Sequence, residues 1–504
     1  MLQKLRYHPN VRLCLARKLD LFFENGTIYR YYSLCGREQA PTFCGRLRHG
    51  RQNRNGGNSL FKSLKRSAKG AGVPHAKATA GQATVQMPVP EHVIIPMSMH
   101  IGAPAEPVVK KGDTVMVGTL IGKAGGFVSA NIHSSVSGTV QDVAPMRMVN
   151  GVMTTAVAIK TDGQQTVDPA CVPPTVTDKA SLMAAVQACG LVGVGGAGFP
   201  THVKLAADTI DTLLINAAEC EPYLTTDCRE MLECSDTIIA GIAAVMKYCS
   251  IPKCIIGIER NKPECIDLMC SLVRQMPGVS VKPLPTRYPQ GAEKTLVETC
   301  TGREVPQVGP AGKPGLPADV GCVIMNVTSV STLGKFLKTG MPLTTKRVTV
   351  EGDAIAKPQN VEVPIGTLYR DVIEACGGIK PGVELGKIIF GGPMMGGASP
   401  SADFPVLKQN NGLLLFSKQA ADLPEASACI RCGRCIDACP MGLEPVVIAE
   451  AFNNKDTDAL KARCIDLCVA CGSCSYACPA KRPVSQTMAL AKAWYLAEQR
   501  KGGK

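Results

Sequence analysis

Short apolar runs alternate with segments of helical spacing between residues 178 and 337. The runs at 211–217, 253–259, 279–284 and 321–326 have the length and composition of buried strands. Apolar residues recur at helical spacing in 178–190, 263–276 and 327–337. Because alternating strands and helices favour a parallel sheet, we predict an α/β domain in this part of the chain.

The segments on either side have other patterns. Residues 98–140 alternate short β-prone stretches with glycine, and VKKGDTVMVGTLIGK (109–123) is similar to biotinyl and lipoyl carrier domains. The Met-Lys-Met or Asp-Lys-Ala hairpin of such carriers is missing here, so we favour a structural barrel-sandwich module. Residues 346–398 resemble a soluble-ligand-binding β-grasp (SLBB) domain. Residues 485–504 are predicted to form an amphipathic helix that covers its neighbouring domain or touches a partner.

The composition is that of a folded protein with several domains. Its 504 residues are 45% hydrophobic and 19% charged, enough for about three to five domains. No uninterrupted apolar run reaches 18 residues, and the N-terminal pattern is not that of a secretory signal. We therefore expect a cytoplasmic protein, and docking on a membrane complex stays open.

The net charge of +14 is concentrated at the N-terminus. Residues 1–66 hold 14 Lys and Arg against 3 Asp and Glu, whereas the other 438 residues have a net charge of only +3. We interpret 1–66 as a basic extension: an RNA- or lipid-binding tail, a disordered segment, or upstream sequence read from a misassigned start. For the rest of the chain we expect no nucleic-acid partner.

Two cysteine motifs lie near the C-terminus. Residues 429–440 (CIRCGRCIDACP) and 468–479 (CVACGSCSYACP) both read C-x2-C-x2-C-x3-C-P. Two such runs are the ligand pattern of a ferredoxin domain with two [4Fe–4S] clusters, in which each run gives its fourth cysteine to the other cluster. Structural zinc is the alternative, but zinc usually takes two separated cysteine pairs. The predicted ligands are Cys429, Cys432, Cys435 and Cys478 for cluster 1, and Cys468, Cys471, Cys474 and Cys439 for cluster 2.

Cys464 precedes the second run, and we interpret it as a bystander thiol. The sixteen cysteines outside the two motifs, which include Cys464, show no ligand spacing. So many unpaired thiols fit a reducing cytoplasm. His100, His133 and His202 are isolated and are interpreted as ordinary residues.

A glycine-rich loop, VGVGGAGFPTHVKL (192–205), contains Gly193, Gly195, Gly196 and Gly198. Glycines let backbone N–H groups approach an anion, and a helix after the loop together with Lys204 would favour phosphate. The spacing is neither that of the Rossmann fingerprint nor that of a P-loop. A tight turn between two packed helices is the alternative interpretation.

Polar residues follow the predicted strands. Asn216, Glu219 and Glu221 follow the first strand, and Asn326 follows the last. The carboxyl ends of strands in open α/β sheets are where ligands bind. YPQGAEKTLVE (288–298) adds a junction of loop and helix with Tyr288, Gly291 and Glu293.

These motifs resemble a known family. GVGGAGFPTHVKL, NAAECEP, YPQGAEKTL and MNVTSVSTL occur in the order of the flavin-bearing, NADH-oxidising subunit of respiratory complex I and its relatives in soluble hydrogenases. The similarity is closer to the RnfC subunits of Rnf complexes, membrane-bound ferredoxin:NAD oxidoreductases. Residues 98–140 look like the RnfC N-terminal domain, which the complex I subunit lacks.

The resemblance implies FMN, NAD(H) and two [4Fe–4S] clusters as cofactors. It implies that Gly193, Gly195, Gly196, Gly198 and Lys204 cradle FMN, and that Asn216 and Asn326 bond to the flavin or its phosphate. Tyr288, Gly291 and Glu293 match the loop that contacts flavin and nucleotide, while Glu219, Glu221 and Phe199 would line the NADH site. Hydride transfer needs no acid or base, so no catalytic residue is named.

Three positions depart from the complex I relatives. Those relatives carry an Asp at the position of Ala218, a Glu at that of Ala292 and an aromatic residue, used near the adenine, at that of Ala207. These departures affect the predicted NAD contacts more than the flavin pocket.

The predicted fold class is therefore a multidomain α/β protein. It comprises a basic extension (1–66), a barrel-sandwich β module (67–170), a Rossmann-like parallel FMN/NAD domain (175–340), an SLBB β-grasp domain (341–400), an α-helical two-cluster ferredoxin domain (415–485) and a C-terminal helix and tail (486–504).

The predicted function is that of the NAD-facing oxidoreductase subunit of an ion-translocating, membrane-associated Rnf complex. It would work with other Rnf subunits and, indirectly, with ferredoxin. A cobalamin-reductase-like flavoprotein and an electron-transfer scaffold without its own NAD site are the alternatives.

Overall fold

The computed structural model describes residues 22–24, 27–29, 70–309 and 314–502. The predicted basic extension therefore lies outside the described residues, apart from the short antiparallel strands β1 (Phe22–Glu24) and β2 (Thr27–Tyr29). A second compact unit comprises Arg66–Lys504. In the part of the chain that is described, no helix is long and apolar enough to span a membrane.

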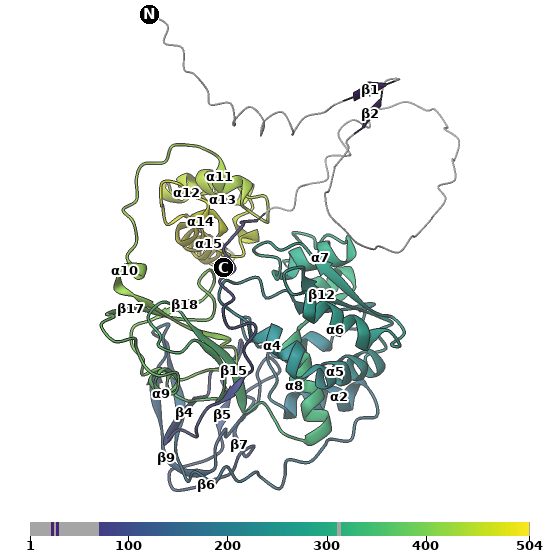
Figure 1. Cartoon of the computed structure of the whole chain (residues 1–504), viewed down its shortest axis with the longest axis vertical. Helices are drawn as coiled ribbons and strands as arrows, with labels where there is room; N and C mark the ends of the chain where they lie inside the picture. Colours follow the sequence, from purple (N-terminus) through teal and green to yellow (C-terminus); the bar gives the residue numbers. More distant parts are fainter. Residues whose placement is uncertain (1–21, 25–26, 30–69, 310–313, 503–504) are drawn as a thin grey trace, which may run out of the picture. The chain divides into compact units, whose positions relative to one another are not determined.

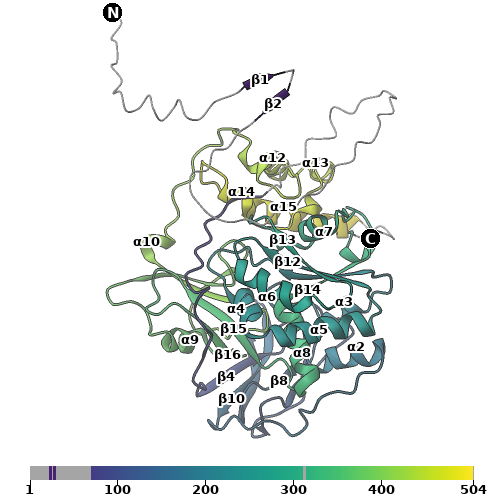
Figure 2. The same ribbon diagram turned by 45° about the vertical axis from the view of Figure 1, so that its right-hand side comes forward.

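A parallel sheet forms the middle of this unit, as predicted. Its strands are β11 (Thr212–Ala217), β12 (Lys253–Glu259), β13 (Val279–Leu284) and β14 (Cys322–Asn326), in the order β13-β12-β11-β14. β12 is labelled in Figure 1, and β13 and β14 are labelled with it in Figure 2. The chain moves from β11 to one side and returns to its other side with β14. The carboxyl ends of β11 and β14 therefore meet at a topological switch point, where open α/β sheets bind ligands.

Alternate residues of these strands enter two hydrophobic cores. Leu213 and Ile215 pack on one face, and Leu214 packs on the other with Leu296 of α7. The two cores put helices on both faces of the sheet, as its continuous apolar strands require. The helices of this domain are α2 (Lys179–Ala188), α3 (Thr201–Leu205), α4 (Thr226–Glu233), α5 (Ser235–Tyr248), α6 (Pro263–Val273), α7 (Glu293–Thr301), the 3-10 turn η2 (Pro317–Val320) and α8 (Val327–Thr339).

Two small sheets form the predicted β module. One has the order β4-β10-β9-β6 and the other β5-β7-β8. Ile95, Ile121 and Ile132 are fully buried in the core that this module shares with the α/β domain. The strands are β4 (His92–Pro96), β5 (Glu106–Pro107), β6 (Thr114–Val115), β7 (Leu120–Lys123), β8 (Ile132–His133), β9 (Gly138–Arg147) and β10 (Met153–Thr161).

A six-stranded mixed sheet of order β18-β17-β19-β15-β16-β3 contains the predicted β-grasp domain. It extends past the predicted boundary at residue 400, because β19 (Gly412–Ser417) inserts between β17 and β15. At the far edge, β3 (Val85–Gln86) pairs with β16. The other elements are β15 (Thr345–Glu351), β16 (Gln359–Pro364), α9 (Tyr369–Ala375), β17 (Leu385–Phe390), β18 (Gly397–Ser399) and α10 (Lys418–Ala421).

Short helices make up the cysteine-rich domain. Met488 and Ala491 of α15 pack against Ile448, Leu460 and Ile465, so the C-terminal helix covers this domain. This contact agrees with the first of the two interpretations of residues 485–504. The helices are α11 (Arg434–Asp437), α12 (Pro445–Asn453), α13 (Thr457–Ala462), η3 (Ile465–Leu467), α14 (Ser473–Tyr476) and α15 (Val484–Gly502) (Figure 2).

Residues 70–87, here called the strap, contact the α/β domain, the β-grasp domain and, through the buried cluster of Ala71, Val73 and Cys471, the cysteine-rich domain. Ala71 pairs with Tyr288 of the α/β domain, and β3 joins the β-grasp sheet. Between them the ammonium group of Lys77 donates to the carbonyls of Glu219 (2.9 Å), Glu221 (2.8 Å) and Leu224. The strap therefore fixes the segment that follows β11.

Candidate functional site

The glycine loop lies between α2 and α3 as a tight, partly exposed turn. Val192 pairs with Pro200, and the Gly193 N–H donates to the Phe199 carbonyl at 2.9 Å. Pro200 occupies the N-cap position of α3. Thus the loop is a tight turn between two helices. Its exposed part is Gly195, Gly196 and Ala197, whereas Gly193 is half-buried and Gly198 is buried.

The exposed part of this loop fits an anion. Among the described residues, the backbone N–H groups of Gly195, Gly196 and Ala197 have no hydrogen-bond acceptor. A Cβ added at Gly196 would meet no atom closer than the Gly193 carbonyl oxygen, at 4.0 Å, so it would project into open space. A phosphate can approach such donors closely because the glycines have no side chains.

Two asparagines lie at the switch point beside this loop. Asn216 and Asn326 are register partners at the ends of β11 and β14. The Asn216 amide donates to the Gly291 carbonyl (2.9 Å), and the Asn326 amide donates to Asp227 (2.9 Å). The Asn326 amide nitrogen is 3.6 Å from the position of a Cβ added at Gly195. The structure thus brings together three motifs that are far apart in the sequence.

The Glu219 side chain faces the N-terminus of α4. Its carboxylate accepts from the N–H groups of Asp227 (2.6 Å) and Cys228 (3.3 Å), and only 8% of the residue is exposed. Burial raises the pKa of Glu219 to about 7, while Lys77 opposes that rise. The structure therefore places Glu219 beside the switch point as a helix-capping carboxyl.

Glu221 contacts the β-grasp domain. Its carboxylate accepts from the N–H groups of Met394 (3.0 Å) and Met395 (2.9 Å). A Cβ added at Gly392 would lie 2.3 Å from the Glu221 carboxylate, so only glycine fits at that position. Burial raises the pKa of Glu221, and these two N–H groups oppose the rise.

Lys204 and Glu293 form an ion pair of 2.7 Å between α3 and α7. Their side chains are 27% and 48% exposed, so both remain accessible from solvent. Phe199 is half-buried at the end of the glycine loop. These three residues surround the region that the resemblance assigns to the nucleotide.

Residues 285–292 are the loop that the resemblance assigns to flavin contact, here called the flavin-side loop. Tyr288 connects this loop to the second cysteine motif. Its hydroxyl donates to the Cys471 carbonyl at 2.7 Å. Tyr288, Cys471, Ala71 and Val73 form one buried apolar cluster, with Met394 packed against it. Tyr288 is 1% exposed, so this contact lies inside the molecule.

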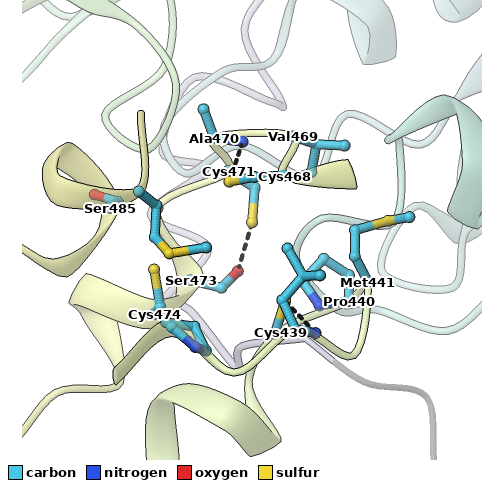
Figure 3. A pocket seen from close by; sticks show the side chains of 14 residues that line it. Cys439, Pro440, Met441, Cys468, Val469, Ala470, Cys471, Ser473, Cys474 and Ser485 are labelled. Atoms are coloured by element: carbon cyan, nitrogen blue, oxygen red, sulfur yellow. Dashed lines mark hydrogen bonds between the residues drawn. The ribbon is translucent and has the colours of Figure 1, made fainter. Parts of the chain in front are cut away.

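The four predicted ligands of cluster 2 line a single cavity (Figure 3). Its wall is largely apolar and includes Met441, Leu443 and Met488. Backbone N–H groups of Leu443 and Ala470 donate to the sulfurs of Cys439 (3.4 Å) and Cys468 (3.5 Å). Four thiols around a cavity with N–H···S bonds fit a multinuclear cluster, whereas a single zinc needs four sulfurs about 2.3 Å from one point.

The predicted ligands of cluster 1 are less enclosed. Cys429 and Cys432 are exposed, whereas Cys435 and Cys478 are half-buried. Burial raises the pKa of Cys435, and the nearby Cys478 adds to that rise. The Ser427 N–H donates to the Ala480 carbonyl at 3.0 Å, which holds the start of one motif beside the end of the other. The predicted exchange of fourth ligands agrees with this arrangement.

The two motifs have the same backbone. Arg431 and Ala470 have φ of 54° and 52°, and Gly433 and Gly472 have φ of 77° and 80°. α11 and α14 begin directly after these two glycines. Each motif therefore wraps its cysteines in the same loop, as a duplicated cluster site requires. Cys464 lies before the second loop and does not line the cavity.

The three positions that differ from the complex I relatives, Ala218, Ala292 and Ala207, have different surroundings. Ala218 is fully buried, and its carbonyl accepts from Lys262 at 2.7 Å. Ala292 is the N-cap residue of α7. Ala207 follows α3, and its carbonyl accepts from Lys179 at 2.9 Å.

Sequence reasoning missed several residues near the glycine loop. The Asn411 amide nitrogen is 3.3 Å from a Cβ added at Gly195, and Asp227 binds Asn326. Lys408 is fully buried and donates to the carbonyls of Asn131 (2.6 Å) and Gly190 (2.7 Å). Asn411 and Lys408 have their partners in other domains, whereas Asp227 meets Asn326 only through the folding of the α/β domain itself.

Comparisons with known proteins agree with this architecture. The RnfC barrel sandwich hybrid domain matches residues 65–164, and the Nuo51 FMN-binding domain matches 186–335. The SLBB domain matches 347–397, and the 4Fe-4S dicluster domain matches 428–481. These matches identify FMN and [4Fe–4S] clusters as the cofactors.

Named relatives match most of the chain. A subunit of the Na+-translocating ferredoxin:NAD+ oxidoreductase complex of Acetobacterium woodii is 42% identical over 84% of this chain and 96% of that protein. The corresponding subunit of the proton-translocating complex of Clostridium ljungdahlii is 43% identical over 74% and 81%. A solved NAD+-reducing [NiFe]-hydrogenase in the air-oxidized state has a TM-score of 0.41 and 19% identity, covering 64% of this chain and 62% of that chain. The chain therefore belongs to the RnfC family, whose members are subunits of ion-translocating ferredoxin:NAD+ oxidoreductase complexes.

Proposed function

We propose that this chain passes electrons between NAD(H) and partner subunits of an ion-translocating ferredoxin:NAD+ oxidoreductase, through FMN and two [4Fe–4S] clusters. The hydrogen bond from Tyr288 to the Cys471 carbonyl carries the proposal, because it joins the flavin-side loop directly to a cluster-binding loop. When bound, FMN exchanges a hydride with nicotinamide and single electrons with the clusters.

The chain's own residues bind and orient these groups. The free N–H groups of Gly195, Gly196 and Ala197 would hold the FMN phosphate, with Lys204 nearby as a point charge. Asn216 and Asn326, fixed by Gly291 and Asp227, would bond to the flavin at the switch point. Glu219 and Glu221 hold the walls of the site through backbone N–H groups.

The contacts favour an order for the two cluster sites. The loop with Cys468, Cys471 and Cys474 contacts the flavin-side loop, so we assign cluster 2 to the inner position. Cys429 and Cys432 are exposed, so we assign cluster 1 to the outer position, where electrons enter from or leave to a partner. Single electrons would therefore pass between partner and flavin site through both clusters.

The relatives support a location and partners for this chain. Relatives are subunits of multi-subunit ion-translocating complexes. We place this chain on the cytoplasmic face of the membrane, bound peripherally to other Rnf subunits and exchanging electrons with ferredoxin indirectly.

An anaerobic titration of the full chain, reconstituted with FMN, iron and sulfide, tests this function. NADH should bleach the flavin absorbance and produce the EPR signals of reduced clusters, whereas NADPH should do so much less. Clusters that dithionite reduces but NADH does not, beside a flavin that stays oxidised with NADH, would contradict the NAD site. That result would favour a scaffold with another electron donor.

A further inference from the structure

Phe127 is the most exposed aromatic side chain in the part of the chain that the structure describes. It is 67% exposed, in a chain with only 22 Phe, Tyr and Trp residues. It lies in the turn between β7 and β8 of the barrel-sandwich domain. Exposed aromatic rings at the edge of a site are common means of ligand recognition.

Hydrogen bonds fix this turn beside the glycine loop. The Ile101 N–H donates to the Gly198 carbonyl (3.1 Å), which joins the neighbouring turn to the glycine loop. The Ala103 N–H donates to the Val128 carbonyl (2.9 Å), which joins the two turns to each other. Two hydrogen bonds thus connect Gly198, the buried last glycine of the loop, through the turn at residues 101–103 to the residue after Phe127.

His202 holds Phe127 from the other side. The His202 Nε2–H donates to the Phe127 carbonyl at 2.9 Å, and the two rings meet edge to face with centroids 5.8 Å apart. His202 is buried in α3, the helix that follows the glycine loop. The Phe127 ring therefore has a fixed edge contact, while most of its surface stays in water next to the loop.

An apolar surface surrounds the ring. Ile101 is 45% exposed, and residues 102–104, 125 and 126 are exposed as well. None of these residues carries a charge. A planar, weakly polar base gains more from such a surface than a phosphate or a ribose does.

We propose that Phe127 forms the adenine-binding wall of the dinucleotide site, so that the barrel-sandwich domain completes the site built by the α/β domain. This inference rests on the proposed function, because it takes NAD(H) as the ligand. The adenine would stack on the exposed Phe127 face, and the rest of the dinucleotide would extend from there toward the α/β domain.

Binding of ADP-ribose tests the adenine half alone, since this ligand has no nicotinamide. Calorimetry on the FMN-loaded chain should show about 5- to 150-fold weaker binding for Phe127→Ala, the range expected for losing one base–aromatic stack. Phe127→Tyr should bind as the parent does. Val152→Ala is the matched control, because Val152 is 59% exposed in another turn of the same domain.

Kinetics with ferricyanide as electron acceptor distinguishes binding of the adenine half of NADH from binding of its nicotinamide half. Phe127→Ala should raise the KM for NADH by a similar factor and leave kcat unchanged, and the KM for reduced nicotinamide mononucleotide should not change. Equal ADP-ribose affinity in Phe127→Ala and the parent, or an equal rise for the mononucleotide, overturns the adenine assignment alone. A parent protein that binds neither NADH nor ADP-ribose overturns both this inference and the proposed function.

Discussion

At the scale of single residues, Tyr288 is the side chain whose loss has the clearest consequence. Phenylalanine keeps the ring in its buried apolar cluster and removes only the hydroxyl donor to the Cys471 carbonyl. Cys471 is 8% exposed, so its carbonyl would lose a partner that water replaces poorly. We expect Tyr288→Phe to cost about 1–3 kcal/mol of stability.

The same substitution should change the inner cluster selectively. Potentiometric EPR on Tyr288→Phe should show a shifted midpoint for cluster 2 and an unchanged midpoint for cluster 1, with normal iron and FMN contents. Tyr476→Phe is the control, since its hydroxyl lies 3.4 Å from the Gly72 carbonyl and the residue is 47% exposed. Unchanged midpoints and unfolding temperature in Tyr288→Phe would show that the hydrogen bond has no role.

Glu219 should make stability depend on pH near neutrality. Its pKa is raised to about 7 by burial, so the folded state holds the proton more tightly than the unfolded state does. The stability from the neutral carboxyl is fully present below about pH 4.5, the ordinary range, and is lost as pH rises through about 7.

Glu219→Gln should therefore remove this loss of stability at rising pH, because glutamine does not ionise. The difference in unfolding free energy, variant minus parent, should rise by up to about 3 kcal/mol between pH 5 and pH 8. Thermal unfolding in a pH series checks it, with the exposed Glu425→Gln as control. Parallel curves for Glu219→Gln and the parent would mean that Glu219 is ionised throughout.

At the scale of elements, a substitution in the glycine loop can weaken cofactor binding and leave the fold intact. Gly196→Ala adds a methyl group that touches nothing in the protein and projects from the exposed loop where the anion would lie. We expect a folded protein with a normal iron content that retains less than about a tenth of its FMN, because a clash displaces the phosphate from its donors. Flavin absorbance after gel filtration, divided by iron content, measures this loss.

Gly81→Ala is the matched control for that experiment. Its added Cβ also meets no atom within 4 Å, and Gly81 lies in the strap, outside the glycine loop. Equal flavin retention in Gly196→Ala and Gly81→Ala would move the phosphate site elsewhere. Loss of both iron and flavin in Gly196→Ala would indicate misfolding instead.

Elements with a local signal were predictable. β12 and β13 match their predicted ranges, because apolar runs bounded by turn residues need no information from outside the run. β19 was not predicted as part of the β-grasp sheet, since its partners β15 and β17 are defined only by long-range pairing. For the same reason the boundary at residue 400 omits a central strand.

The site residues also divide into those with a local sequence signal, which were predicted, and those without one, which were missed. Motif residues such as Asn216 and Asn326 were found because strand ends mark ligand sites in parallel sheets. Phe127 and Asn411 were missed, because nothing next to either residue in the sequence shows that it lies beside the glycine loop. The direction of side chains was also out of reach: the carboxylates of Glu219 and Glu221 both turn to backbone N–H groups.

At the scale of the whole molecule, domain contacts favour one order of the two cluster sites along the electron path. The strap, the flavin-side loop and the loop of Cys471 share one buried cluster, and Met394 of the β-grasp domain packs against it. The Lys77 bonds hold the strap to the α/β domain. The inner cysteine loop is therefore fixed against the flavin side by three domains, while Cys429 and Cys432 stay exposed.

This arrangement predicts opposite results for the loss of one cluster or the other. Cys429→Ser should remove the outer cluster and leave an inner cluster that NADH still reduces. Cys474→Ser should remove the inner cluster and leave an outer cluster that dithionite reduces at once but NADH reduces at least about 100-fold more slowly, since the relay is broken. Cys464→Ser, outside the predicted ligand sets, should keep both clusters.

Freeze-quench EPR after mixing with NADH, followed by dithionite on the same samples, measures both rates. The dithionite signal shows that the remaining cluster is present and its loop folded, so a lost NADH signal reports the broken path and not a collapsed domain. Fast reduction of the outer cluster by NADH in Cys474→Ser would reverse the order of the two sites. The exposed cysteines would then face the flavin, and the Tyr288–Cys471 contact would be a structural link only.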